Sequence, residues 1–195
     1  MAPGPPRGEP AAGAVLLTPG AGSGRSHPAL VAIEAALTPL PVWRVDFPYR
    51  KAGRRAPDRA PVLVASVVED AAALARAAEV EPGRLVLGGR SMGGRICSMA
   101  VAEGLAAAGL VLVAYPLHPP GRPERLRVAH LGALRVPCLF VSGTADPFAT
   151  PAELEAATAA IPGRVTHVWI DGGHHELKGA DEEVARVVAT WVRGL

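Results

Sequence analysis

The chain has little cysteine, few aromatic side chains and no long apolar run. Its two cysteines, Cys97 and Cys138, lie among apolar neighbours, which favours buried thiols over a disulfide. No apolar run reaches the length of a membrane span, and no His or Cys cluster has the spacing of a zinc site. We therefore expect a cytoplasmic protein with no membrane association and no bound metal.

Charge of either sign is also scarce, because charged residues make up 19% of the chain and the net charge is +2. Together with 49% hydrophobic residues, this composition is typical of a globular domain. A basic stretch over residues 50–59 could attract an anionic substrate or a nucleic acid. No aromatic residues alternate with its charges, so we interpret it as a solvated loop and expect no nucleic-acid partner.

A length of 195 residues suits one domain with a full core. Residues 1–13 are rich in Pro, Gly and Ala and lack the apolar segment of a signal peptide, which predicts a flexible tail. Residues 14–195 are then a single domain. Nothing in the sequence indicates whether the protein is a monomer or an oligomer.

Short apolar runs alternate with longer helical patterns along this domain. The runs that we expect to be strands are Ala14–Leu17, Val42–Phe47, Leu85–Leu87, Leu110–Ala114, Cys138–Ser142 and Val165–Ile170. The expected helices are His27–Leu37, Val62–Ala78, Arg95–Ala108, Ala152–Ile161 and Asp181–Val192. Continuous apolar strands separated by helices predict an α/β fold, with a mostly parallel sheet and helices on both faces.

The sequence Gly89-Arg90-Ser91-Met92-Gly93 follows one of these strands and precedes a helical pattern. Strand, G-x-S-x-G turn and helix, in that order, form the nucleophile elbow of an α/β-hydrolase. The sharp turn presents the serine hydroxyl, and its glycines let strand and helix approach closely. We therefore expect Ser91 to be a catalytic nucleophile.

A serine nucleophile needs a base, and the base needs an orienting carboxylate. Asp146 follows one expected strand, and His174 and His175 follow the next, which is the Ser, Asp, His order of α/β-hydrolases. Asp171 could compete with Asp146, but it shares the short loop of the histidines, so we expect Asp146 to be the orienter. The pattern alone leaves both histidines open as the base.

Such a site also needs two backbone N–H groups as an oxyanion hole. We expect one from Met92, directly after the nucleophile, and one from Ala21 in the glycine-rich loop after the first strand. That loop could instead bind phosphate, but no Lys-Ser/Thr pair follows it. Candidate substrate-binding side chains are Tyr49, His118 and Phe148.

Several segments resemble the small, lidless bacterial hydrolases called dienelactone-hydrolase-like, which are related to a testis-expressed vertebrate protein. The segments are Thr18–Gly22, Phe47–Arg50, Pro57–Pro61, Gly88–Arg95, Tyr115–Gly121 and Gly143–Phe148. The resemblance implies that His175 is the base. Dienelactone hydrolases themselves carry a cysteine nucleophile, and Pro19 stands where related enzymes often have a histidine.

These observations together predict a serine hydrolase that acts on a small, soluble ester or thioester without a cofactor. Its catalytic set is Ser91, His175 and Asp146. The connection from Ala114 to Cys138 is too short for a cap domain, so we expect an open cleft. The alternative is a non-catalytic scaffold of the same fold that serves as a binding module.

Overall fold

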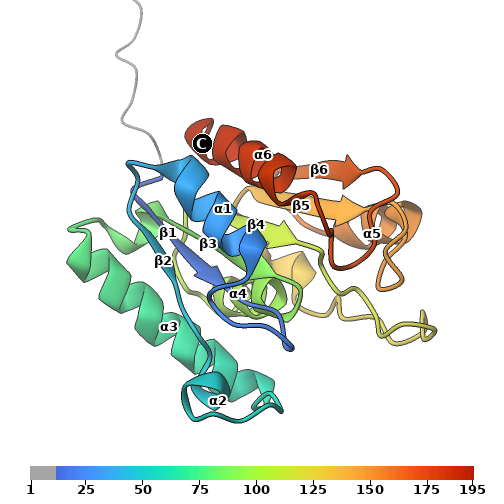
Figure 1. Cartoon of the computed structure of the whole chain (residues 1–195), viewed down its shortest axis with the longest axis horizontal. Helices are drawn as coiled ribbons and strands as arrows, with labels where there is room; N and C mark the ends of the chain where they lie inside the picture. The colour runs from blue at the N-terminus through green and yellow to red at the C-terminus, as the bar shows by residue number, and fades with distance from the viewer. Residues whose placement is uncertain (1–11) are drawn as a thin grey trace, which may run out of the picture.

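A six-stranded sheet organises the computed structural model, which describes residues 12–195 (Figure 1). The strand order is β2-β1-β3-β4-β5-β6, and every neighbouring pair is parallel. The strands are β1 (Ala14–Thr18), β2 (Val42–Arg44), β3 (Leu85–Arg90), β4 (Gly109–Val113), β5 (Cys138–Gly143) and β6 (Val165–Ile170). The predicted parallel α/β architecture is confirmed.

Helices cover both faces of this sheet. They are α1 (Pro28–Leu37), α2 (Pro48–Lys51), α3 (Ala60–Ala77), α4 (Met92–Ala102), α5 (Pro151–Thr158) and α6 (Asp181–Arg193). On one face α1 and α6 pack against each other over a core that includes Val15 and Val86. On the other face α3 and α4 cover Leu16 and Leu87 (Figure 1). Successive strand residues therefore face opposite cores, as a doubly covered sheet requires.

Helix α4 begins three residues before the predicted start and ends well before the predicted end. It begins at Met92 because strand and helix join directly at Ser91, with no intervening loop. It ends at Ala102, and Gly104 then adopts a positive φ of 110°. A left-handed glycine of this kind is a common helix terminator, which the apolar pattern alone does not reveal.

Strand β2 is shorter than predicted, and a short helix follows it. The prediction of strand through Phe47 is wrong, because β2 pairs with β1 only over Val42–Arg44. Pro48 then occupies the first turn of α2, where its fixed φ is favourable and its missing N–H costs nothing. This turn brings Tyr49 under the loop that follows β1.

The predicted tail over residues 1–13 falls outside the described residues, apart from Ala12 and Gly13. Ala12 is buried, and the Gly13 amide donates to the Arg84 carbonyl at 2.7 Å, so both pack against the domain.

Between β4 and β5, residues 114–137 hold a single 3-10 helix, Leu131–Ala133, and no helical cap.

Strand β1, strand β3 and helix α4 meet at unusually short range around Thr18. A Cβ atom on Gly89 would collide with the Thr18 carbonyl oxygen, and one on Gly93 would lie 2.5 Å from the same oxygen. The Thr18 hydroxyl donates to the Gly88 carbonyl at 3.1 Å, which joins the two strands at their ends. Only glycine permits this approach, and it fixes the turn between β3 and α4.

Replacing Gly89 with alanine should therefore destabilise the fold. Because the added methyl group meets backbone and cannot be accommodated by a rotamer change, we expect Gly89→Ala to lose about 3 kcal/mol of unfolding free energy. The matched control is Gly83→Ala, since a Cβ there meets nothing within 4 Å. Urea denaturation of both variants measures the difference, and equal stabilities would contradict the packing described here.

Candidate active site

The carboxyl ends of the strands gather the polar loops at one edge of the sheet. The chain passes from β1 outward to β2 and then returns to β3 on the other side of β1. Ligands in open α/β sheets bind at such a reversal. The loop after β1 carries Ala21, and the turn after β3 carries Ser91, so both lie at this point.

Ser91 occupies a strained backbone conformation between β3 and α4. Its φ is 51° and its ψ is −120°, a region that costs a non-glycine residue on the order of 1–3 kcal/mol. The Ser91 amide donates to the Val113 carbonyl at 2.8 Å, and the Arg95 amide donates to the Ser91 carbonyl at 3.2 Å. These bonds hold the turn from both sides and leave the hydroxyl free to point away from the sheet.

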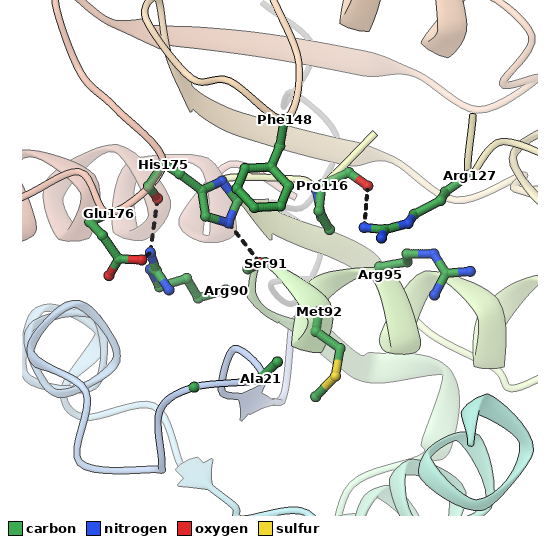
Figure 2. A pocket seen from close by; sticks show the side chains of 11 residues that line it. Ala21, Arg90, Ser91, Met92, Arg95, Pro116, Arg127, Phe148, His175 and Glu176 are labelled. Carbon is green, nitrogen blue, oxygen red and sulfur yellow. Dashed lines mark hydrogen bonds and ion pairs between the residues drawn. The ribbon is translucent and has the colours of Figure 1, made fainter. Parts of the chain in front are cut away.

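The imidazole of His175 bridges Ser91 and Asp146. Its Nε2 lies 2.8 Å from the Ser91 Oγ (Figure 2), and its Nδ1 lies 2.8 Å and 3.1 Å from the two Asp146 oxygens. A carboxylate accepts hydrogen bonds, so Nδ1 donates to Asp146. In the neutral ring Nε2 then accepts from the Ser91 hydroxyl.

Phe148 holds both partners of this bridge in place. Its backbone amide donates to the Asp146 Oδ1 at 2.8 Å. Its ring stacks on the His175 ring with 3.9 Å between centroids (Figure 2). Asp146 itself is only 3% exposed, so water competes little for its carboxylate. The structure thus brings Phe148, Asp146 and His175 together beside Ser91.

The loops that carry Asp146 and His175 are bonded to each other. After β5, the amides of Thr144 and Ala145 donate to the carbonyls of Ile170 and Gly173 at 3.0 Å and 2.9 Å. In return the Gly172 amide donates to the Thr144 hydroxyl at 2.8 Å. These bonds fix the loop that carries the carboxylate and the loop that carries the imidazole relative to each other.

The competing residues lie away from Ser91. His174 is exposed and is not among the residues that line the cavity at Ser91, whereas its neighbour His175 contacts the serine. Asp171 is also exposed, and its Oδ1 accepts from the Thr144 hydroxyl at 3.4 Å. The structure brings to the serine Asp146, which the sequence pattern favoured, and His175, which the resemblance implied.

The two expected oxyanion donors face the same cavity as Ser91. Met92 is the first residue of α4, so its N–H has no carbonyl acceptor within the helix. Ala21 also lines the cavity, in the loop held by the Ser23 N–H to Gly20 carbonyl bond of 3.2 Å. Within residues 12–195, neither amide donates a hydrogen bond to a carbonyl.

Tyr49 does not line the cavity, contrary to the expectation of a substrate-binding wall. Its ring is fully buried and stacks with Phe47 in the core. Its hydroxyl donates to the Ala21 carbonyl at 2.9 Å, and burial raises its pKa. From its position in the core, Tyr49 therefore fixes the loop that carries Ala21.

His118 also lies outside the cavity. Its ring is buried, with Nδ1 2.9 Å from the Pro119 carbonyl oxygen and Nε2 3.5 Å from the Glu153 carboxylate. Its backbone amide donates to the Phe148 carbonyl at 3.1 Å. His118 thus connects the proline-rich loop to the loop of Asp146, and its side chain has no access to a ligand at Ser91.

A cavity of about 450 Å³ opens above Ser91, within the usual range for small-molecule sites. Its lining residues are Ala21, Gly22, Arg90, Ser91, Met92, Arg95, Pro116, Arg127, Phe148, His175 and Glu176. Most of these side chains are visible in Figure 2. The described residues contain no group of three or more His, Cys, Asp or Glu side chains placed to hold a metal ion.

Residues 11–190 match the family model of the alpha/beta hydrolase domain. The chain belongs to this family. Among the described residues of this α/β-hydrolase, no helix has the length and apolar character needed to cross a bilayer.

Solved structures of several hydrolases are similar to this chain. Dienelactone hydrolase from Anabaena variabilis is 21% identical, with a TM-score of 0.73, over 92% of this chain and 85% of that one. The esterase domain of a Rhodothermus marinus protein is 19% identical, with a TM-score of 0.69, over 97% and 89%. The type II thioesterase BorB of the borrelidin cluster is 20% identical, with a TM-score of 0.66, over 95% and 94%. At these identities the likeness shows the fold, and the relation to a testis-expressed vertebrate protein stays a prediction.

Arg90 is a residue of the α/β-hydrolase site that the sequence did not single out. It ends β3, is only 4% exposed, and donates from Nη2 to the His175 carbonyl at 2.8 Å. The same nitrogen lies 2.8 Å from the Glu176 carboxylate (Figure 2). Arg90 therefore ties the loop of His175 to the end of β3, directly before Ser91. The signal in the sequence that could have identified Arg90 is the presence of an arginine at the end of an otherwise apolar strand.

A neutral polar cluster lies behind the cavity wall. The His130 Nε2 is 2.8 Å from the Ser98 hydroxyl and 3.4 Å from the Tyr115 hydroxyl. Burial, and then the charge of Arg95, lower the pKa of His130 from 6.5 to about 4. Burial raises the pKa of Tyr115 to about 12. Both side chains are therefore uncharged near neutral pH.

The lowered pKa of His130 predicts a pH dependence of stability. In the unfolded chain His130 takes up a proton below about pH 6.5, whereas in the folded chain it stays neutral down to about pH 4. The unfolded state then binds more protons in this window, so the unfolding free energy falls as pH falls. We expect His130→Gln to lose less stability than the wild type between about pH 7 and about pH 5.

Urea denaturation at the two pH values measures both losses. His174→Gln is the matched control, because His174 is exposed. It should lose as much stability as the wild type. An identical loss in His130→Gln and in the wild type would show that His130 titrates alike in both states.

Proposed function

We propose that this α/β-hydrolase is a serine hydrolase that cleaves a small, soluble ester or thioester through an acyl-enzyme. Ser91 is the nucleophile, His175 the general base and acid, and Asp146 the orienting carboxylate. The observation that carries the proposal is the His175 bridge, with 2.8 Å to the Ser91 Oγ and 2.8 Å to an Asp146 oxygen. These distances are within the reach that proton transfer requires.

In the first half of the reaction the Ser91 Oγ attacks the carbonyl carbon of the substrate. His175 Nε2 takes the hydroxyl proton as the new C–O bond forms, and Asp146 stabilises the resulting imidazolium. The carbonyl oxygen becomes an oxyanion, held by the N–H groups of Met92 and Ala21. The C–O or C–S bond to the leaving group then breaks, and His175 donates its proton to the departing oxygen or sulfur.

In the second half water takes the place of the leaving group. His175 removes a proton from the water as its oxygen attacks the acyl carbon on Ser91. The same amides hold the second oxyanion. Collapse breaks the bond to Ser91, His175 returns the proton to Oγ, and the carboxylic acid leaves.

The size and openness of the site support a small substrate. The cavity holds about 450 Å³, and residues 114–137 form no cap that could enclose a long acyl chain. Phe148, Met92 and Pro116 supply its apolar wall. No helix of the described residues spans a membrane, and a cytoplasmic location stays a prediction.

Replacing Ser91 separates the enzyme from a non-catalytic scaffold. We expect the wild type to hydrolyse 4-nitrophenyl acetate and Ser91→Ala to lose on the order of 10⁴–10⁶ in kcat, because the attacking atom is gone. Ser26→Ala is the matched control, since Ser26 is exposed and lies outside the cavity. Intact-mass analysis after fluorophosphonate treatment should find one adduct on the wild type and none on Ser91→Ala. Full turnover without Ser91 would remove this serine as the nucleophile, whereas a wild type that neither turns over nor forms the adduct would favour the scaffold.

Replacing Asp146 tests the orienting role. Asp146→Asn keeps the shape but presents an amide to His175, which can stabilise the wrong tautomer and no longer supports the imidazolium. We expect a loss of about 10³–10⁴ in kcat on the same ester. Asp171→Asn, in the exposed neighbouring loop, should stay within about threefold of the wild type. Equal losses in the two variants would remove Asp146 from the mechanism.

A further inference from the structure

The wall of the cavity beyond Ser91 carries two arginines, Arg95 and Arg127, that have no acidic partner. Figure 2 shows both on the opposite side of Ser91 from His175. Within residues 12–195, no Asp or Glu oxygen lies in ion-pair contact with either guanidinium. Positive charge without a counter-ion therefore faces the space above the nucleophile.

Each of these arginines is held in position by its backbone. Arg95 lies in the first turn of α4, one turn from Ser91, and its Nε is buried without a hydrogen-bond partner. The Arg127 amide donates to the Leu117 carbonyl at 2.8 Å, and its carbonyl accepts from the Tyr115 hydroxyl at 3.0 Å. Its guanidinium makes one long bond, from Nη1 to the Pro116 carbonyl at 3.3 Å.

Arg90, on the other side of the same cavity, provides the contrast. Its guanidinium is neutralised by the Glu176 carboxylate and bonded to the His175 carbonyl. The charge of Arg90 is thus neutralised within the fold. Most of the hydrogen-bond donors of Arg95 and Arg127, by contrast, have no acceptor among the described residues.

The surroundings of the pair do not cancel its charge. Burial, and then the charge of Arg95, lower the pKa of Arg127, and the exposed Arg125 acts in the same direction. The neighbouring His130 and Tyr115 are uncharged near neutral pH. Two like charges facing one cavity repel each other, and an anion between them would relieve that repulsion.

The position of the pair determines which end of a substrate it meets. In the proposed mechanism the leaving group receives its proton from His175, so it must lie on the His175 side of Ser91. The acyl group then extends to the opposite side, toward Arg95 and Arg127. A negative charge bound there would belong to the far end of the acyl chain.

We propose that Arg95 and Arg127 form a carboxylate-binding subsite and that the substrate is a monoester or monothioester of a dicarboxylic acid. This rests on the proposed serine-hydrolase function. The guanidinium donors match a carboxylate in shape and charge. The free carboxylate anchors the acyl chain while its ester carbonyl lies at Ser91, between the Met92 and Ala21 amides.

The test compares matched pairs of 4-nitrophenyl esters. The monoesters of glutaric and adipic acid carry the carboxylate, and the pentanoate and hexanoate esters have the same chain lengths without it. For each protein the quantity is the ratio of kcat/KM for the acid ester to kcat/KM for its neutral partner. We expect a wild-type ratio of roughly tenfold or more, because the carboxylate accepts charge-assisted hydrogen bonds from the arginines and the alkyl end of its neutral partner accepts none.

In Arg95→Met and Arg127→Met the ratio should fall by about tenfold in each. Taking the ratio removes any loss that the two esters share, including a loss from a damaged fold. Arg122→Met is the matched control, because Arg122 is exposed on the same loop and outside the cavity, and it should keep the wild-type ratio. Raising the salt concentration should lower the wild-type ratio through screening.

The outcomes separate this inference from the proposed function. If the wild type hydrolyses neutral esters through Ser91 with a ratio at or below one, the carboxylate subsite is wrong and the serine hydrolase stands. A ratio unchanged in both arginine variants also overturns the subsite. If no ester is cleaved and Ser91 forms no fluorophosphonate adduct, the proposed function itself fails.

Discussion

The approach of the Thr18 carbonyl to Gly89 and Gly93 is the contact on which the site depends. It lets β1, β3 and α4 meet without side chains between them, so the chain can turn within one residue. That residue is Ser91, which is held at a positive φ by the elements on either side. The same geometry makes Met92 the first residue of α4, so its N–H has no acceptor within the helix and, in the proposed mechanism, binds the carbonyl oxygen of the substrate. The proposed nucleophile and one of the two proposed oxyanion donors therefore follow from one packing constraint.

The remaining groups reach Ser91 from distant parts of the chain, and each is fixed by bonds to the backbone. The loops after β5 and β6 are joined through Thr144 and Ala145, and Arg90 ties the second of them to β3. Tyr49 holds the loop after β1 through its hydrogen bond to the Ala21 carbonyl. The charge of Arg90 is paired with Glu176 within this assembly, whereas Arg95 and Arg127 line the cavity without an acidic partner among the described residues.

Most of the fold could be predicted from the sequence, because apolar runs of strand length alternate with helical patterns. The G-x-S-x-G sequence also marks the turn at which β3 ends and α4 begins. The order of Ser91, Asp146 and His175 placed all three at strand ends for the same reason. Tyr49 and His118 do not line the cavity as expected, since α2 packs Tyr49 into the core and His118 is buried against Pro119 and Glu153, contacts that local sequence does not encode. The contacts of Arg90, Arg95 and Arg127 could not be predicted either, because they depend on which distant loop each long side chain meets.

A crystal structure of the chain after reaction with a small fluorophosphonate tests the central claim most directly. The phosphonate mimics the tetrahedral intermediate and carries an oxygen in the place of the oxyanion. The account predicts a bond from phosphorus to the Ser91 Oγ, with that oxygen about 2.7–3.1 Å from the backbone nitrogens of both Met92 and Ala21. His175 should remain between Asp146 and the former serine hydroxyl. A phosphonyl oxygen that points away from both amides, or an adduct on another residue, would contradict it.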